Sequence, residues 1–293
     1  MTATLMDGKA LALDVKDRLR NQVSRLKSQG VEPTLATILV GDNPASKTYL
    51  DIKHKAARDI GVKSVNYTLG PATTHAELTA LISDLNSQSA VHGILLQLPL
   101  PAHLDAVYAL AGISPEKDVD GLTPAYVNRL FYYKASLVPC TAKGIMALLH
   151  RYEVPISGAH VVVINRSMLV GRPLYQLLLG EDATVTVCHS KTRNLPEISR
   201  DADIVVTAVG RRPTFTLTAD MVKEGAVVID VAMNRVEGRM VGDADFEPVA
   251  AKASYITPVP GGVGPMTVAM LLENTVAATT NQVEALRPVE VPL

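Results

Sequence analysis

Val161-Val-Val-Ile-Asn-Arg-Ser-Met-Leu-Val-Gly171 is the stretch that decides the fold. Its apolar, β-branched beginning predicts a buried strand, and a polar turn then leads into a helix. In doubly wound α/β domains this connection is where a dinucleotide binds. The usual G-x-G-x-x-G is absent, because the turn is Asn165-Arg166-Ser167 and the first glycine is Gly171. The turn is either an ordinary polar connection or an anion site, in which free helix N–H groups, Arg166 and Ser167 contact phosphate.

The next apolar run, Ala183-Thr-Val-Thr-Val-Cys188, ends in His189-Ser190-Lys191-Thr192-Arg193. A site for NAD would place an Asp or Glu here to bind the ribose 2′-hydroxyl. Ser190, Lys191 and Arg193 offer hydrogen-bond donors and positive charge instead. A dinucleotide site in this chain is therefore predicted to accept a 2′-phosphate, which favours NADP over NAD.

Composition excludes several classes of protein. The chain has 293 residues, of which 47% are hydrophobic and 19% charged, so two folded domains are possible and disorder is not expected. Its net charge of −1 provides no overall field for nucleic acid or an anionic membrane. No apolar run approaches the ~20 residues that cross a bilayer, and the first residues lack the pattern of a signal peptide. We expect a cytoplasmic protein with no nucleic-acid or membrane partner.

The cysteines and histidines indicate neither a disulfide nor a metal site. Cys140 and Cys188 lie far apart in the sequence, which suits a reducing compartment. The seven histidines never pair at the spacing of metal ligands, and there is no C-x-x-C. No bound metal is predicted.

Apolar runs alternate with helical patterns, which predicts parallel sheets with crossover helices. Strands are expected at residues 35–40, 65–69 and 93–98, with helices at 10–29, 44–60, 77–85 and 141–152. Residues 114–139 are less regular. After a turn at Pro155-Ile-Ser-Gly158, strands are expected at 161–164, 184–188, 204–209, 226–231 and 254–257, with helices near 174–179, 196–202, 219–224, 245–251 and 265–286. The predicted fold is α/β with two domains, 1–143 plus 265–293 and a Rossmann-like 144–264, joined by long helices with a cleft between them.

Tyr49 and Lys53 are four residues apart on a predicted helix, so their side chains lie on one face. They follow the carboxyl end of the strand at 35–40, which is the edge where ligands bind in α/β sheets. A lysine with a lowered pKa can donate or accept protons there. Spacing alone favours the other interpretation, a surface lysine beside a half-buried tyrosine.

Three further segments contain candidate site residues. Gln97 ends an apolar strand, where its amide must be hydrogen-bonded or face a cleft, and its place before Pro99 favours the cleft. Asp118-Val119-Asp120-Gly121 lacks the remaining ligands of a calcium loop, so it is either a solvated turn or a carboxylate that grips a guanidine-like ring edge. Pro258-Val-Pro-Gly-Gly-Val-Gly-Pro265 is either a plain connection or a close backbone approach to a ligand.

Together these segments resemble one known family over nearly the full chain. The matching stretches are Gly41-x-x-x-Ala-Ser-x-x-Tyr49-x-x-x-Lys53-x-Lys-Ala, Gly93-Ile-Leu-Leu-Gln-Leu-Pro-Leu-Pro101, Pro115-Glu-Lys-Asp-Val-Asp-Gly121, Pro139-Cys-Thr-x-x-Gly144, Arg166-Ser-x-x-Val-Gly-Arg-Pro173 and Tyr255-Ile-Thr-Pro-Val-Pro-Gly-Gly-Val-Gly-Pro-Met-Thr267. In order and spacing they are similar to the bifunctional methylenetetrahydrofolate dehydrogenase/methenyltetrahydrofolate cyclohydrolase family.

The resemblance implies an enzyme that oxidises 5,10-methylenetetrahydrofolate with NADP+ and hydrolyses the methenyl product to 10-formyltetrahydrofolate in one shared site. Lys53 would be the principal acid/base residue, Tyr49 would line the folate site, and Gln97 would orient Lys53 and the substrate. Asp120 would hold the amino-pyrimidinone end of the pterin. The substrate site would also include Leu98, Pro260 and Gly264.

On the cofactor side, the resemblance implies contacts of NADP with Asn165, Arg166, Ser167 and Ser190. Thr141 would lie near the nicotinamide, and Met233 aligns with an aliphatic residue that contacts the cofactor. The resemblance also implies a homodimer that acts in one-carbon metabolism and purine biosynthesis. The domain 1–143 plus 265–293 would bind folate, and 144–264 would bind NADP.

The chain departs from the family pattern at three positions. Asn165 and Ala232 stand where the family usually has glycine, and Ala142 stands where it commonly has proline. A side chain at position 165 narrows the approach to the cofactor or requires a conformation that asparagine tolerates better than most residues. Two alternatives follow: a cyclohydrolase with impaired cofactor binding, and an NAD(P) dehydrogenase of another small substrate.

Overall fold

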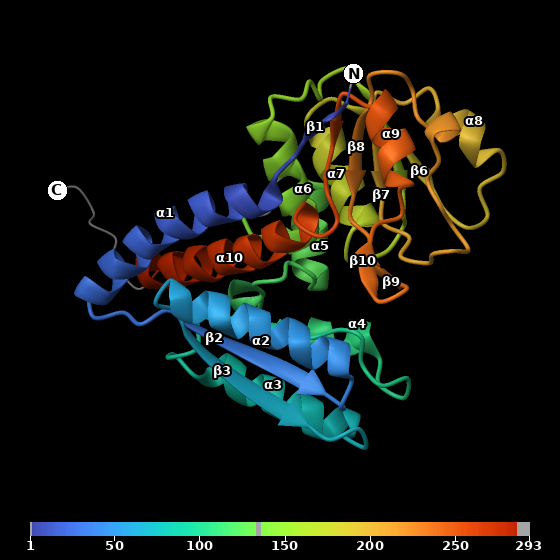
Figure 1. Ribbon diagram of the computed structural model, residues 1–293. Coiled ribbons are helices and arrows are strands. Elements are labelled where there is room, and N and C mark those ends of the chain that lie inside the picture. Colours follow the sequence, from blue (N-terminus) through green and yellow to red (C-terminus); the bar gives the residue numbers. More distant parts are fainter. Residues whose placement is uncertain (1, 133–135, 286–293) are drawn as a thin grey trace. The chain divides into compact units, whose positions relative to one another are not determined.

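The computed structural model describes residues 2–132 and 136–285 and contains two compact units, each built on its own parallel sheet (Figure 1). Of the described residues, the six-stranded unit comprises 2–13, 130–132 and 139–270, and the three-stranded unit comprises 14–129, 136–138 and 271–285. The predicted α/β class with two domains is confirmed.

The three-stranded unit is a parallel sheet with strand order β3-β2-β4. Its strands are β2 (Thr34–Val40), β3 (Lys63–Leu69) and β4 (Gly93–Leu96), and its longer crossover helices are α2 (Pro44–Asp59) and α3 (His75–Ser87). Side chains of β2 alternate between the faces, so that Ala36, Ile38 and Val40 pack against α3 while Thr37 faces α2. Shorter helices follow at α4 (Ala106–Ala111), η1 (Pro115–Lys117) and α5 (Pro124–Phe131).

Local sequence signals place the crossover helices. Asn43 caps α2 by accepting the N–H groups of Ala45 and Ser46, and Pro44 occupies the first turn, where its missing N–H costs nothing. Thr74 and Glu77 form a capping box at the start of α3. The cap of α2 fixes the residue at which this helix begins, and it thereby fixes where each α2 side chain lies along the sheet.

The six-stranded unit is a parallel sheet with strand order β1-β11-β8-β7-β5-β6. Its strands are β1 (Thr4–Leu5), β5 (His160–Ile164), β6 (Thr184–Cys188), β7 (Ile204–Thr207), β8 (Val227–Asp230) and β11 (Tyr255–Ile256). Its helices are α6 (Cys140–Arg151), α7 (Gly171–Gly180), α8 (Leu195–Ser199), η2 (Ala219–Met221) and α9 (Phe246–Lys252), with an antiparallel hairpin of β9 (Asn234–Val236) and β10 (Arg239–Val241). The chain goes from β5 to β6 on one side and then to β7 on the other, so the switch point lies between β5 and β7.

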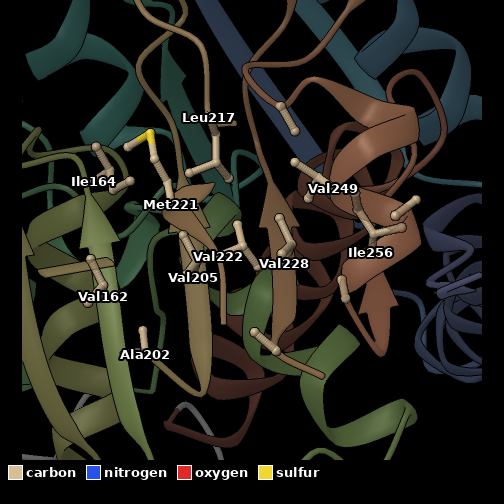
Figure 2. Packing of buried hydrophobic residues seen from close by; sticks show 14 of the residues in the cluster. Val162, Ile164, Ala202, Val205, Leu217, Met221, Val222, Val228, Val249 and Ile256 are labelled. Atoms are coloured by element: carbon tan, nitrogen blue, oxygen red, sulfur yellow. The ribbon is translucent and has the colours of Figure 1, made fainter. Parts of the chain in front are cut away.

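A hydrophobic cluster fills one face of this sheet (Figure 2). Val162 and Ile164 alternate with the residues of β5 that point to the other face, and they pack beside Val205 of β7 and Val228 of β8. Val249 of α9 covers them. The β-branched run Val161–Ile164 is thus a buried strand, paired with β7 on one side and with the edge strand β6 on the other.

Two long helices cross the division between the units. The boundary between the units falls between Leu13 and Asp14 in α1 (Gly8–Ser28) and between Met270 and Leu271 in α10 (Val263–Ala285). The last helix was expected to end at Leu286, which lies outside the described residues. None of the helices described is both long and apolar enough to span a bilayer.

Four local expectations need correction. The helix expected at 219–224 is one 3₁₀ turn, η2, because Val222 already has an extended backbone. The irregular region 114–139 contains α5, and the strand expected at 93–98 ends at Leu96. β1 and the β9–β10 hairpin were not predicted, since strands of two or three residues are too short to show an alternating pattern.

Candidate active site

Tyr49, Lys53 and Gln97 come together in the three-stranded unit. Lys53 is 6% exposed, its Nζ donates to Oε1 of Gln97 at 3.0 Å, and it lies 4.5 Å from the centre of the Tyr49 ring. The helical spacing places Tyr49 under the ammonium, where the electron-rich ring face attracts a cation. The interpretation of Lys53 as a surface lysine is therefore wrong.

Gln97 follows β4 and has both ends of its amide engaged. Its Oε1 accepts from Lys53, and its Nε2 donates to the carbonyl oxygen of Leu98 at 2.7 Å. Its own N–H donates to the carbonyl oxygen of Ile38 at 2.9 Å, which ties it to β2. The amide is thereby held with its oxygen toward the ammonium.

The acidic turn beside this cluster is built around Asp118. Asp118 is 1% exposed, and its carboxylate accepts the N–H of Gly121 at 2.9 Å and that of Thr123 at 2.7 Å. Burial raises the pKa of Asp118, while the hydrogen bonds from Thr123 oppose that shift. The interpretation as a solvated turn is therefore wrong for Asp118, whereas Asp120 is half-buried.

Lys117 and Asn274 hold this turn from outside. The buried ammonium of Lys117 donates to the carbonyl oxygens of Leu85, Asn86 and Gln88 at 3.1, 2.8 and 2.7 Å, at the end of α3. Asn274 of α10 donates to the carbonyl oxygen of Val119 at 2.9 Å. Asp120 thus stands on a turn that is fixed on both sides.

In the six-stranded unit, Asn165 stands at the switch point, directly after β5. Its Nδ2 donates to the carbonyl oxygen of Ala208 at 2.6 Å, and its Oδ1 accepts the N–H groups of Ser167 at 2.7 Å and Gly171 at 3.0 Å. Among the described residues, the positive-φ positions other than glycine are Glu153, Asp182, Asn194 and Glu237. The special backbone conformation anticipated for Asn165 is therefore not needed.

Close packing and hydrogen bonds shape the turn that follows. A Cβ on Gly171 would collide with the carbonyl oxygen of Asn165. The N–H of Val170 donates to Oγ of Ser167 at 3.1 Å, and that of Arg172 donates to the Ser167 carbonyl oxygen at 3.0 Å. The expectation of free N–H groups is therefore wrong for residues 170–172. The groups of this turn that can still bind an anion are the exposed side chains of Arg166 and Ser167.

Ser190 stands at the same edge of the sheet as Arg166. Each lies two residues beyond the paired Ile164 and Cys188, which end β5 and β6. Ser190 belongs to a turn closed by two hydrogen bonds between His189 and Thr192, of 2.8 and 2.9 Å. The side chains of Ser190, Lys191 and Arg193 are exposed.

The other predicted site residues of this unit lie near the starts of α6 and α10. Thr141 is in the first turn of α6, and Oγ1 of Thr267 donates to its Oγ1 at 3.2 Å. Met233 is 55% exposed, and a Cβ on Gly264 would lie 3.9 Å from its Sδ. Pro260 is exposed in the turn that precedes α10.

Two buried aspartates at the carboxyl edge of this sheet were missed. Asp243 accepts the N–H groups of Val209 at 2.7 Å and Gly210 at 3.0 Å, so it shapes the loop after β7. Asp230 accepts the N–H groups of Ala232 and Ala244, and burial raises its pKa to about 6. No motif or spacing in the sequence distinguishes these two aspartates from surface ones.

The fold and these side chains define a class: an α/β protein that combines a buried lysine cluster with a dinucleotide-type switch point. Two family descriptions match the chain: "Tetrahydrofolate dehydrogenase/cyclohydrolase, catalytic domain" at residues 6–120, and the "NAD(P)-binding domain" of the same family at residues 139–283. The chain therefore belongs to the tetrahydrofolate dehydrogenase/cyclohydrolase family, as the sequence predicted.

Relatives agree over almost the whole length. The bifunctional protein FolD of Nitrosopumilus maritimus is 54% identical over 280 residues, which are 96% of this chain and 98% of the relative. The bifunctional FolD methylenetetrahydrofolate dehydrogenase/cyclohydrolase of Campylobacter jejuni has a TM-score of 0.92 at 50% identity, covering 95% of this chain and 99% of the other. The dehydrogenase-cyclohydrolase of Trypanosoma brucei, solved with NADP and an inhibitor, has a TM-score of 0.92 at 41% identity, covering 97% and 99%.

Proposed function

We propose that this enzyme oxidises 5,10-methylenetetrahydrofolate to 5,10-methenyltetrahydrofolate with NADP+ and then hydrolyses that product to 10-formyltetrahydrofolate at one shared site. The observation that carries the proposal is the buried contact between Lys53 Nζ and Gln97 Oε1, 3.0 Å long, above the Tyr49 ring. Family membership and the two named activities of the relatives support it.

The two reactions make different demands on the protein. In the first, a hydride leaves the methylene carbon and NADP+, when bound, accepts it, so the protein mainly has to position the substrate. In the second, water adds to the methenyl carbon, loses a proton, and the ring opens at nitrogen to leave the formyl group. Proton transfer is needed only in the second reaction, and it is therefore where an acid/base residue matters most.

Lys53 is placed to perform this proton transfer. Gln97 Oε1 accepts one proton of the ammonium and so fixes Nζ, while the Tyr49 face stabilises its charged form. Once Nζ has lost a proton other than the one bound to Gln97, its lone pair can take a proton from the attacking water. The ammonium that forms can then give this proton to the departing nitrogen. Asp120, on its fixed turn, would bind the amino-pyrimidinone through two hydrogen bonds. Leu98, Pro260 and Gly264 complete the proposed substrate contacts.

The residues at the switch point fit NADP. Arg166 and Ser167 offer a charge and a hydroxyl to phosphate, since Ser167 Oγ uses a lone pair rather than its proton on Val170. The turn after β6 carries Ser190, Lys191 and Arg193 and has no carboxylate, which suits a 2′-phosphate. Thr141 and Met233 remain proposed contacts of the cofactor, whereas the side chain of Asn165 is committed to its own backbone partners.

Lys53→Met tests the role of the lysine. We expect cyclohydrolase turnover to fall by about a hundredfold or more, with a smaller effect on hydride transfer, because only hydrolysis needs the proton. A coupled spectroscopic assay that follows NADPH and methenyl-folate together measures both steps. Lys55→Met, an exposed lysine on the same helix, is the matched control. Cyclohydrolase turnover near wild type in Lys53→Met would show that the assignment is wrong.

We further propose a folate domain of 1–143 plus 265–293 and an NADP domain of 144–264. The compact units support this division, because 144–264 lies within the six-stranded unit and 271–285 is grouped with 14–129. We also propose a cytoplasmic homodimer that serves purine biosynthesis. The buried thiol of Cys188 supports a reducing compartment. Sedimentation of the pure protein at micromolar concentration tests the dimer, and a monomer would contradict it.

A further inference from the structure

His54, the residue after Lys53 on α2, is buried against the sheet and has no part in the roles above. It is 8% exposed. Its Nε2 lies 3.1 Å from Oγ1 of Thr37 on β2, and its Nδ1 lies 2.5 Å from Oγ of Ser64 on β3. Both ring nitrogens are thus held by neighbouring strands under the helix.

The hydrogen bonds around Thr37 decide which ring nitrogen carries the proton. Asn66 Nδ2 donates to Thr68, so its Oδ1 is the acceptor that faces Thr37, whose hydroxyl donates to it at 3.0 Å. With its proton used, Thr37 accepts from Nε2–H of His54, and Nδ1 then accepts the proton of Ser64. Burial lowers the pKa of His54, and the Arg58 charge lowers it further, in keeping with a neutral ring.

Lys53 and His54 hold α2 from two directions. Successive residues on an α-helix point about 100° apart. Lys53 reaches toward Gln97 beyond the end of β4, whereas His54 reaches Thr37 on β2 and Ser64 on β3. A rotation of α2 that moves Nζ away from Gln97 must also pull the imidazole from its two hydroxyls.

We propose that His54 is a positioning residue for hydrolysis: through Thr37 and Ser64 it fixes the rotation of α2 and hence the place of Lys53 Nζ. The inference rests on the proposed function, in which Lys53 moves the proton. Because hydride transfer depends less on Nζ than hydrolysis does, a misplaced Lys53 affects the two steps unequally.

The test compares two variants that break the same contact. His54→Leu and Thr37→Val are each expected to lower cyclohydrolase kcat by about tenfold, while dehydrogenase kcat and the KM for folate change by less than about threefold. The double variant is expected to be no worse than His54→Leu alone, because His54→Leu already removes the contact with Thr37. His54→Gln keeps a donor for Thr37, so it is expected to recover most of the lost turnover.

Ile82→Ala is the control for a loss of stability alone. Ile82 is buried in α3, against the face of the sheet opposite α2, and its removal lowers stability without touching His54. Unchanged cyclohydrolase kcat in His54→Leu, or an equal fall in Ile82→Ala at matched unfolding free energy, would overturn the inference. If Lys53→Met is inactive in hydrolysis and His54→Leu is not, only His54 is misassigned. If Lys53→Met still hydrolyses at the wild-type rate, the role proposed for Lys53 is wrong, and the inference about His54 fails with it.

Discussion

Asn165 Nδ2 and the carbonyl oxygen of Ala208 are 2.6 Å apart, a hydrogen bond that joins the ends of β5 and β7 across the switch point. The same side chain accepts the N–H groups of Ser167 and Gly171 through Oδ1. A glycine at this position could make none of these bonds. The Asn165 side chain therefore organises the turn between β5 and α7.

Asn165→Gly is expected to loosen this turn. The loss of three hydrogen bonds at about 1 kcal/mol each, with the added freedom of glycine, predicts a fall of about 3–4 kcal/mol in unfolding free energy. The Kd for NADP+ is expected to rise severalfold because binding must then order the turn, while cyclohydrolase turnover stays unchanged. Urea unfolding and NADP+ calorimetry measure the two effects. Asn194→Gly makes the same substitution at an exposed position with φ of 53°, and it is the control for the change in unfolding free energy. Tighter NADP+ binding by Asn165→Gly would mean that Asn165 obstructs the cofactor.

Ser190→Asp tests the proposed 2′-phosphate site. A carboxylate there repels the phosphate and can instead bind a ribose hydroxyl, so we expect kcat/KM for NADP+ to fall by about a hundredfold while that for NAD+ changes little. Initial rates with each cofactor give the ratio. Thr184→Asp places the same charge at the opposite end of β6 and is expected to leave the preference unchanged. A wild-type enzyme that uses NAD+ as well as NADP+ would contradict this assignment.

The fold could be predicted where local pattern and tertiary burial agree. β5 is four apolar β-branched residues after His160, and α2 has Pro44 at its start and Gly61 just after its end. The hairpin at Asn234–Val241 could not be predicted, because its strands have three residues each and are partly polar. Pattern methods need several periods, and these elements supply fewer than two.

The site could be predicted only in part, because sequence shows residue type but not burial. The spacing of Tyr49 and Lys53 places them on one face, yet it does not show that Lys53 is enclosed. Lys117 and Asp243 are charged residues, which usually lie at the surface, so their sequence context predicts exposure. In the structure both are buried and fix the backbone of loops at the site.

Asp230 predicts an unusual pH dependence of stability. Burial raises its pKa from 3.8 to about 6, so the folded state binds its proton more tightly than the unfolded state does. Its contribution is therefore fully present below about pH 4 and is lost as the pH rises through about 6, by about 3 kcal/mol. Urea unfolding of wild type and Asp230→Asn between pH 4 and 7 measures it. As the pH rises, the unfolding free energy of the wild type is expected to fall relative to that of Asp230→Asn. A difference that does not vary with pH would contradict the raised pKa.

Lys117 predicts a link between stability and folate binding. Lys117→Met leaves three carbonyl oxygens at the end of α3 without their ammonium, so we expect unfolding free energy to fall by about 3 kcal/mol. Because the same residue holds the turn that carries Asp120, the KM for the folate substrate is expected to rise severalfold at 25 °C, while kcat changes less. Lys63→Met removes only an exposed ion pair with Glu32 at 3.6 Å and is expected to cost less than about 1 kcal/mol. Urea unfolding of both variants measures the change in unfolding free energy, and steady-state kinetics measure the KM for the folate substrate. A Lys117→Met enzyme that loses stability but keeps its folate KM would show that Asp120 does not depend on this anchor.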